Sequence, residues 1–178
     1  MKKILLILLT IITLSCNHED TTTTTPTDKT SINLVTGITC RQAPDDAPTQ
    51  FGNPNTLVNN KFTIYPNPAV NLFYVISQEN VSAAWIVPAT PEKIYQEFNF
   101  GTILNTNLYT ETTIISHSIL SMGPQSSDTF SIDITTLEKG YYKLFVKIGT
   151  QIYWDNFHKY GDQPTHEEQG AALINYWN

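Results

Sequence analysis

The chain has 178 residues with 10 basic and 16 acidic side chains, a formal net charge of -6, and only 15% charged residues. This length suits a single domain with one hydrophobic core and argues against a multi-domain enzyme. Basic side chains are too few to form a patch for phosphates, so we expect no nucleic-acid partner.

The first 15 residues have the pattern of a signal peptide. Lys2 and Lys3 precede an apolar run from Ile4 to Leu14. This run is too short to cross a hydrocarbon core, which takes roughly 20 apolar residues. We therefore expect residues 1–15 to direct export and to be removed.

Ser15 and Cys16 follow the apolar run. Leu14-Ser15-Cys16 resembles the lipobox of bacterial lipoproteins, in which the cysteine is acylated and becomes the first mature residue. The resemblance implies a lipid anchor on Cys16, and two or three acyl chains hold a protein stably on a membrane. Glu19 and Asp20 form an acidic cluster that resembles the export signal of surface lipoproteins in the Bacteroidetes group. The expected location is the outer membrane at the cell surface, and an ordinary cleaved signal peptide is the alternative.

Residues 16–30 form the expected lipidated linker. Thr21–Thr25 belong to a low-complexity threonine tract that offers no apolar side chain to a core. Fully extended, residues 17–30 reach at most about 46–50 Å. The folded domain, expected over residues 31–178, can therefore stand clear of the lipid headgroups.

From residue 31 onward the hydrophobic pattern has a period of two, which is typical of strands with one buried face. Tyr142, Leu144 and Val146, for example, alternate with residues predicted to face water. Gly149-Thr150 suits a tight hairpin connection. The fold class expected is all-β, an antiparallel sandwich with a short C-terminal helix over 165–176. The predicted strands are 32–40, 61–65, 70–77, 82–87, 112–120, 129–134, 140–149 and 151–157, and the proline-rich residues 41–60 are predicted to form a surface loop or an edge segment.

Two motifs resemble a known family. Ile64-Tyr65-Pro66-Asn67-Pro68-Ala69, followed by an alternating segment, looks like the opening motif of the C-terminal sorting domain of the type IX secretion system. Residues 132–146, with Leu137 and Gly140 before an aromatic-rich segment, are similar to its closing pattern. That domain is an immunoglobulin-like sandwich, so the resemblance implies this fold for residues 61–149. We expect no cargo domain, so the fold is carried over and the sorting role is not.

The sequence contains no phosphate-binding glycine loop, nucleophile elbow, zinc-protease helix or calcium loop. Two imidazoles and three carboxylates gather in the C-terminal region, and such groups suit zinc or a similar ion. Gly161 and Pro164 interrupt their spacing, so we expect a solvated loop and neither a metal nor a cofactor. The five residues are His158, Asp162, His166, Glu167 and Glu168.

Other reactive side chains have structural interpretations. Asp45 and Asp46 are a candidate acid-base or calcium pair, but neighbouring aspartates point in different directions, which favours a solvated turn. His117 lies in a predicted strand on the face of Ile115, which favours a partly buried histidine over a catalytic one. Cys40 lies in an alternating stretch and is predicted to be a buried small hydrophobe, not a nucleophile.

Aromatic residues give the candidate binding surface. Neighbours in a strand point to opposite faces, so one ring of the Tyr153-Trp154 pair must face away from the sandwich core. The favoured expectation is that residues 41–60 or the tail cover this ring. An exposed ring is suited to stacking on sugars or anchoring a protein, which makes Tyr153, Trp154 and Tyr160 the candidate ligand-binding residues.

The sequence thus predicts a lipid-anchored β-sandwich that binds or assembles and does not catalyse, with a protein or a glycan as its partner besides the membrane. One alternative is a glycan-binding accessory module, which needs coplanar exposed rings. The other is a small metal-dependent hydrolase, which needs His158 and His166 to converge beside a carboxylate.

Overall fold

A computed structural model describes residues 32–54, 61–93 and 109–178 of the chain. The predicted signal peptide, the lipidation site Cys16 and the threonine linker lie outside these described residues. The described part is all-β with short helices, as predicted, and its strands form two larger sheets and one separate hairpin.

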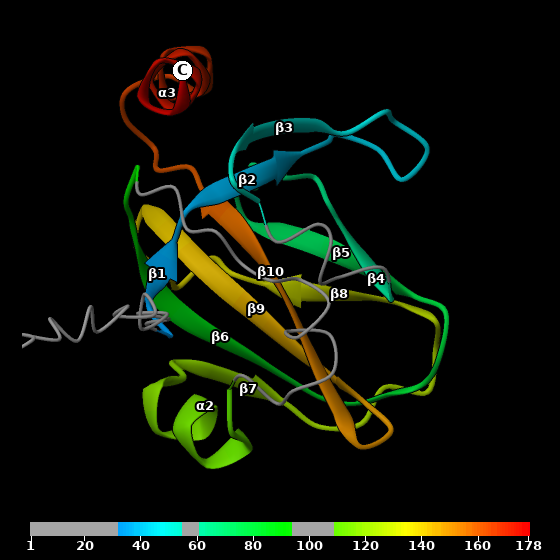
Figure 1. Cartoon of the computed structure of the whole chain (residues 1–178). Helices are drawn as coiled ribbons and strands as arrows, with labels where there is room; N and C mark the ends of the chain where they lie inside the picture. Colours follow the sequence, from blue (N-terminus) through cyan, green and yellow to red (C-terminus); the bar gives the residue numbers. More distant parts are fainter. Residues whose placement is uncertain (1–31, 55–60, 94–108) are drawn as a thin grey trace, which may run out of the picture.

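The larger sheet has five strands, and Figure 1 shows it through the middle of the molecule. β6, β9 and β10 pair antiparallel in that order, β1 is added in parallel to β6, and β7 pairs with part of β6. The bounds are β1 Leu34–Val35, β6 Val81–Pro91, β7 Leu120–Met122, β9 Gly140–Ile148 and β10 Gln151–Lys159. The predicted hairpin is confirmed, because Ile148 pairs with Gln151 and Gly149 has the positive φ of 59° that a tight turn requires.

The smaller sheet has three antiparallel strands, in the order β4-β5-β8. Their bounds are β4 Phe62–Tyr65, β5 Leu72–Ser77 and β8 Thr129–Asp133. Alternate side chains of both larger sheets meet in the main hydrophobic core, where Phe73 of one sheet packs on Phe157 of the other with ring centroids 4.7 Å apart. The period-two pattern therefore identified the inward face of these strands correctly.

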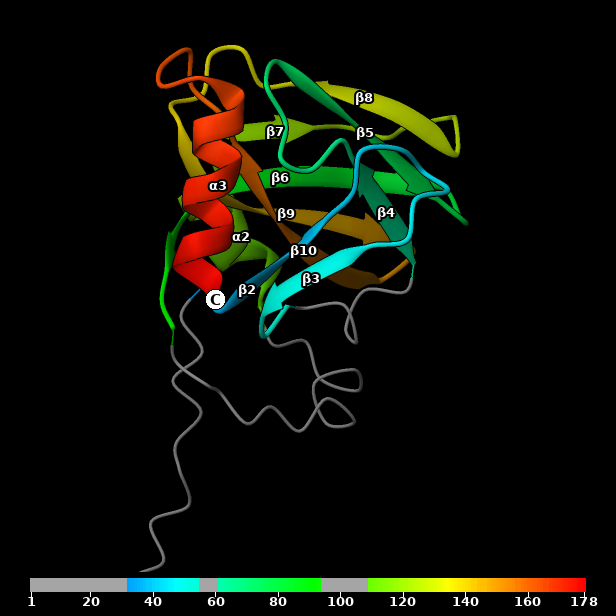
Figure 2. The ribbon, with the colours of Figure 1, turned by 90° about the horizontal axis from the view of Figure 1, so that it is seen from above.

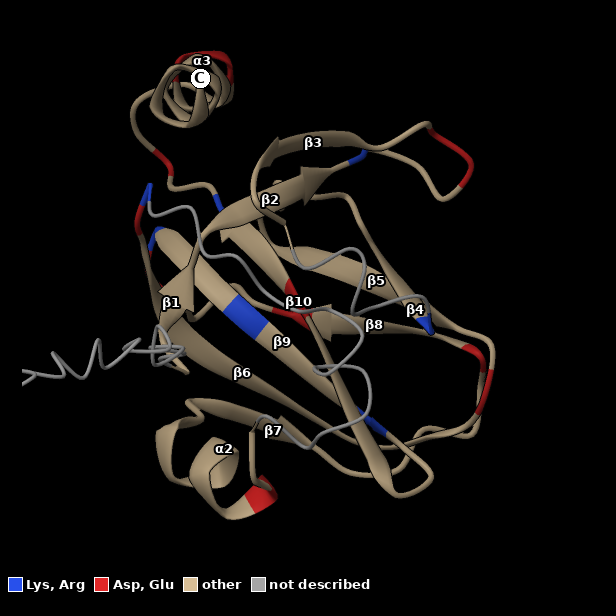
Figure 3. Ribbon diagram, in the orientation of Figure 1, with Lys and Arg blue, Asp and Glu red and all other residues tan. Residues whose placement is uncertain are grey.

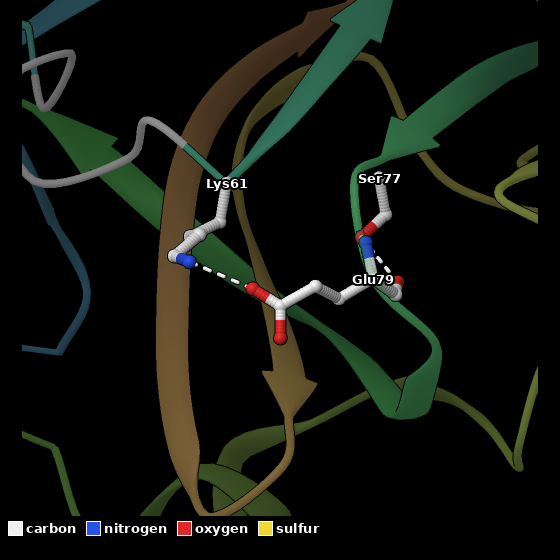
Figure 4. A network of polar contacts seen from close by, with 3 residues as sticks. All are labelled: Lys61, Ser77 and Glu79. Atoms are coloured by element: carbon white, nitrogen blue, oxygen red, sulfur yellow. Dashed lines mark hydrogen bonds and ion pairs between the residues drawn. The ribbon is translucent and has the colours of Figure 1, made fainter.

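The turn from β5 into β6 is held by local polar contacts (Figure 4). The Ser77 hydroxyl donates to the Glu79 carbonyl oxygen at 2.6 Å, and the Lys61 ammonium lies 2.7 Å from the Glu79 carboxylate. Both charged side chains are partly exposed, so this ion pair adds little to stability.

The outer face of β9 and β10 differs from its prediction. The alternation placed Tyr141, Lys143 and Phe145 toward water, yet Lys143 is 2% exposed and Phe145 is fully buried. The reason is that this face is covered as well: Phe145 and Trp154 pack under Tyr109 in a second hydrophobic cluster. The central strands β9 and β10 are therefore buried on both faces over much of their length.

The predicted strand over 112–120 is wrong. The structure has a helix, α2 Glu111–His117, followed by β7. Its N-cap is Thr110, whose side chain accepts a hydrogen bond from the Thr113 backbone N–H. Only Ile114 of α2 is buried, and it joins the second cluster. The run of isoleucine and threonine favours a strand by propensity, and tertiary packing of this one side chain overrides it.

Residues 41–60 are only partly a loop. Within them β3 Thr49–Gly52 pairs antiparallel with β2 Gly37–Cys40, and residues 55–60 lie outside the described residues. The strand predicted over 32–40 is divided between β1 and β2, which join different sheets. The β2–β3 hairpin lies against β10 and extends the cover of the outer face.

The predicted C-terminal helix is confirmed as α3 His166–Trp177. Thr165 and Glu168 form a capping box, in which each side chain satisfies a backbone N–H of the other residue. Leu173 and Trp177 pack in a third hydrophobic cluster with Val35 and Ile38, and Figure 2 shows α3 beside β2 and β3. Among the described residues, no helix combines the length and the apolar character needed to span a membrane.

Candidate ligand pocket at the C-terminal helix

Asn67, from the Pro-Asn-Pro motif, joins three segments at the base of the candidate site. Its side chain is 1% exposed. The amide nitrogen donates to the carbonyl oxygens of Thr39 at 2.6 Å and Asn156 at 3.0 Å, and the amide oxygen accepts from the His158 backbone N–H at 3.1 Å. Asn67 also exchanges two backbone hydrogen bonds with Arg41. The motif thus fixes the end of β10, where His158 lies, against β2.

A pocket of about 210 Å³ lies between α3 and this end of the β9–β10 hairpin. Its walls are mainly apolar and aromatic, with one imidazole and one ammonium group. The lining residues are Lys139, Tyr141, His158, Pro164, Gln169, Ala172, Leu173 and Tyr176.

His158 is the polar group of the inner wall. Its side chain is 7% exposed, and its Nδ1 atom is buried without a hydrogen-bond partner in the described structure. The ring contacts Tyr141 edge-on, with centroids 4.6 Å apart. Burial, and then the nearby Lys139 ammonium, lowers the pKa of His158 to about 4. The imidazole is therefore neutral at physiological pH, with one ring nitrogen as donor and the other as acceptor.

Lys139 and Gln169 shape the pocket in different ways. Lys139 is exposed, and its aliphatic chain lies so close to Gly161 that a Cβ there would approach within 3.1 Å. Gln169 is 2% exposed and holds the preceding loop, accepting from the Gly161 N–H and donating to the carbonyl oxygens of Gly161 and Pro164. Its amide is thereby engaged within the protein. Sequence reasoning missed both residues: Lys139 lies in the closing motif but was given no role there, and Gln169 lies in no motif.

The two tyrosine hydroxyls at the pocket each make one hydrogen bond within the protein. The Tyr141 hydroxyl accepts from Trp177 Nε1 at 3.0 Å, and the Tyr176 hydroxyl donates to the Pro91 carbonyl oxygen at 3.0 Å. Burial raises the pKa of Tyr141 to about 12, so its hydroxyl stays protonated. The rings act as walls of the pocket. Because the Tyr141 oxygen accepts from Trp177, its own O–H is left as a donor at the pocket, beside the Lys139 ammonium.

The five C-terminal residues considered for a metal do not converge. Tyr160 lies between the two imidazoles, with ring centroids 5.5 Å from His158 and 5.5 Å from His166. Glu168 is used in the capping box, and Asp162 and Glu167 are exposed. The described residues contain no group of three histidine, cysteine or acidic side chains that could hold a metal ion.

The candidate aromatic surface divides between the two faces of the sheet. Trp154 is 5% exposed, in the second cluster, so its indole is not available to a surface ligand. Within the described residues, Tyr109 and Ile114 of α2 belong to the cluster that covers it. Tyr153 packs against the main core, and Tyr160 lies between imidazoles. These three rings therefore form no common platform.

The other reactive side chains are placed as follows. His117 is exposed at the end of α2, near the Thr113 carbonyl oxygen, so the predicted partial burial in a strand is wrong. Asp46 accepts from the backbone N–H groups of Gln42 and Ala43 and caps an exposed turn, as expected. Burial, and then the Asp155 carboxylate, raises the pKa of the half-buried Cys40 to about 12, which makes its thiolate scarce.

A buried amine was not anticipated. Charge lies within β9 and β10 as well as at the edges of the fold (Figure 3). Lys143 of β9 is 2% exposed, and its Nζ donates to Asn156 Oδ1 of β10 at 2.9 Å. Burial lowers the pKa of Lys143 to about 7, against a smaller opposing effect of Asp155. Alternation alone predicted a solvated lysine here.

Comparisons of the chain with protein-family models, with curated proteins and with solved structures found no match. The chemistry of the pocket and the pattern of the N-terminal residues are therefore the grounds for a function.

Proposed function

We propose that the chain is a lipoprotein, anchored in the outer membrane through Cys16 and displayed at the cell surface, whose β-domain is a non-catalytic binding module. The pocket at α3 carries the binding part of this proposal. Its described lining contains one neutral imidazole, one ammonium and no carboxylate, so it offers recognition groups without an acid-base pair.

The anchor is supported by the residues Leu14-Ser15-Cys16 behind a cationic and apolar leader. We also propose that the two larger sheets form an immunoglobulin-like sandwich, similar to the type IX sorting domain. The shared core between β4-β5-β8 and β6-β9-β10 supports this, together with Asn67, which gives the Pro-Asn-Pro motif a structural purpose.

Replacing Cys16 by alanine is expected to move the protein from the membrane fraction to the soluble fraction and to abolish labelling by a palmitate analogue. The reason is that without the acyl chains no stable membrane attachment remains. Fractionation and metabolic labelling in the native host measure both effects.

The matched control is Cys40→Ala, because the chain has only 2 cysteines. This variant should keep both the label and the membrane location. An unchanged membrane fraction for Cys16→Ala contradicts the anchor. Surface display is measured separately by protease treatment of intact cells, where replacing Glu19 and Asp20 by alanine should protect a protein that is still anchored.

A further inference from the structure

Lys143 and Asn156 bring an amine and an amide together inside the larger sheet. They are direct cross-strand partners on β9 and β10, which run side by side (Figure 1), and Val87 of β6 is the partner of Lys143 on its other side. Lys143 is 2% exposed and Asn156 is fully buried. Both functional groups therefore lie in a site that excludes bulk water, which protects a reacting amide from hydrolysis.

The amine lies close to the carbon atom that it can attack. Lys143 Nζ donates to Asn156 Oδ1 at 2.9 Å. A C=O bond is about 1.23 Å long, so Nζ lies within about 4.1 Å of Asn156 Cγ. Asn156 Nδ2 donates to the Gly37 carbonyl oxygen at 2.7 Å, which fixes the plane of the amide. Groups held in this way react at a high effective concentration, and a small movement of Nζ from the oxygen toward the carbon gives the geometry of attack.

The electrostatics around Lys143 favour the same reaction. Burial lowers the pKa of Lys143 to about 7, so a large share of the amine is neutral and nucleophilic at physiological pH. Asp155 is 9% exposed, its Oδ1 accepts from the Asn156 backbone N–H at 2.8 Å, and its charge acts on Lys143. This carboxylate stabilises the positive charge that develops on Nζ as the bond to carbon forms.

We propose that Lys143 and Asn156 form an isopeptide bond, which joins β9 covalently to β10. Nζ attacks Cγ, the Nζ–Cγ bond forms, the Cγ–Nδ2 bond breaks, and the leaving nitrogen takes one proton from the amine and departs as ammonia. The reaction consumes no oxidant, reductant or cofactor. Because Nζ donates to the oxygen in the folded chain, the bond accumulates after folding, and until it forms Lys143 remains an amine that takes up and releases a proton.

The bond secures one edge of the domain. β10 is the last strand of the five-stranded sheet, and the two linked residues lie 13 positions apart in the chain. If a protease cuts the turn between β9 and β10, the two strands stay attached. This role goes beyond ligand binding. It requires neither the lipid anchor nor a ligand, so the bond and the proposed function can fail independently.

The test is peptide mapping of the denatured lipoprotein, before and after the folded protein is kept for about two weeks at about 37 °C. Trypsin cuts after unmodified lysines and leaves an acylated lysine uncut. The linked product is residues 140–147 joined to residues 148–159, about 17 Da lighter than the two peptides together because ammonia is lost. We expect this product in the wild type, in an amount that rises during the incubation, with fragment ions that locate the bond at Lys143 and Asn156.

Two variants make the result specific. Lys143→Met removes the nucleophile, so residues 140–147 should appear as a separate peptide and the linked product should be lost. The matched control is Lys61→Gln, which removes a partly exposed lysine whose ammonium lies 2.7 Å from the Glu79 carboxylate. This control should keep the linked fraction within about twofold of the wild type.

Three results count against the bond. The first is a wild-type chain that yields only separate peptides after the incubation, which needs no variant to fold. The second is a linked product that persists in Lys143→Met, which places the bond elsewhere. The third is a loss of about 17 Da confined to residues 148–159, which shows that Asn156 reacts with its own backbone and not with Lys143.

Discussion

Replacing Asn67 by alanine is expected to lower the free energy of unfolding by about 3–5 kcal/mol. The amide makes three hydrogen bonds, all to backbone groups in a site that is 1% exposed. Removing it leaves the Thr39 and Asn156 carbonyl oxygens and the His158 N–H buried without this partner. Urea unfolding of the variant against the wild type measures the loss, and the His158 backbone amide resonance should shift in the folded variant.

Two further variants make the Asn67 result specific. Asn67→Asp keeps an acceptor for the His158 N–H but cannot donate to the two carbonyl oxygens, so it should destabilise at least as strongly as alanine. Asn71→Ala changes an exposed asparagine nearby and should cost no more than about 0.5 kcal/mol. A loss below about 1 kcal/mol for Asn67→Ala would show that Asn67 does not join these segments energetically.

The second large effect concerns pH. We expect the free energy of unfolding to contain a term from Lys143 that rises by about 2 kcal/mol between about pH 7 and about pH 9. The pKa of Lys143 is lowered to about 7 in the folded protein, against 10.5 as the ordinary value. In this window the unfolded chain binds the proton and the folded chain does not, so stability increases as pH rises. Below the folded pKa both states are charged, and the full cost of burying the charge is present.

The Lys143 term is isolated by comparing variants. Urea unfolding across this pH range should show a rise in the wild type relative to Lys143→Met, which has no amine to titrate. Lys61→Met removes a partly exposed lysine and should keep the rise. The comparison is made below about pH 9 because the thiol of Cys40 has a raised pKa and contributes with the opposite sign at higher pH. Parallel curves for the wild type and Lys143→Met would refute a perturbed amine.

The inward and outward faces of a strand were predictable from the sequence where only one face of that strand is buried. Phe130 and Ile132 of β8 alternate with exposed residues, and the pattern gave the right face. β9 carries the same alternation, yet Lys143 and Phe145 are buried. A period of two identifies two faces, but it does not say how many of them will be covered, because the cover comes from distant segments.

The site was partly visible in the sequence. His158 was considered as a metal ligand with His166 and was expected in a solvated loop. It is instead buried at the end of β10, and the ring of Tyr160 between the two imidazoles could not be foreseen from spacing. Asn67 was noticed only for its flanking prolines. Its partners lie 28 to 91 positions away in the chain, and no local pattern encodes hydrogen bonds of that range.

β9 pairs with β6 on one side and β10 on the other, and its two faces lie under separate hydrophobic clusters. Its amide protons can therefore exchange with solvent only when the whole domain opens, whereas α2, which buries one side chain, can detach by itself. We therefore expect α2 to open while β9 stays paired. The indole of Trp154, which shares a cluster with Ile114 of α2, can then become exposed without global unfolding.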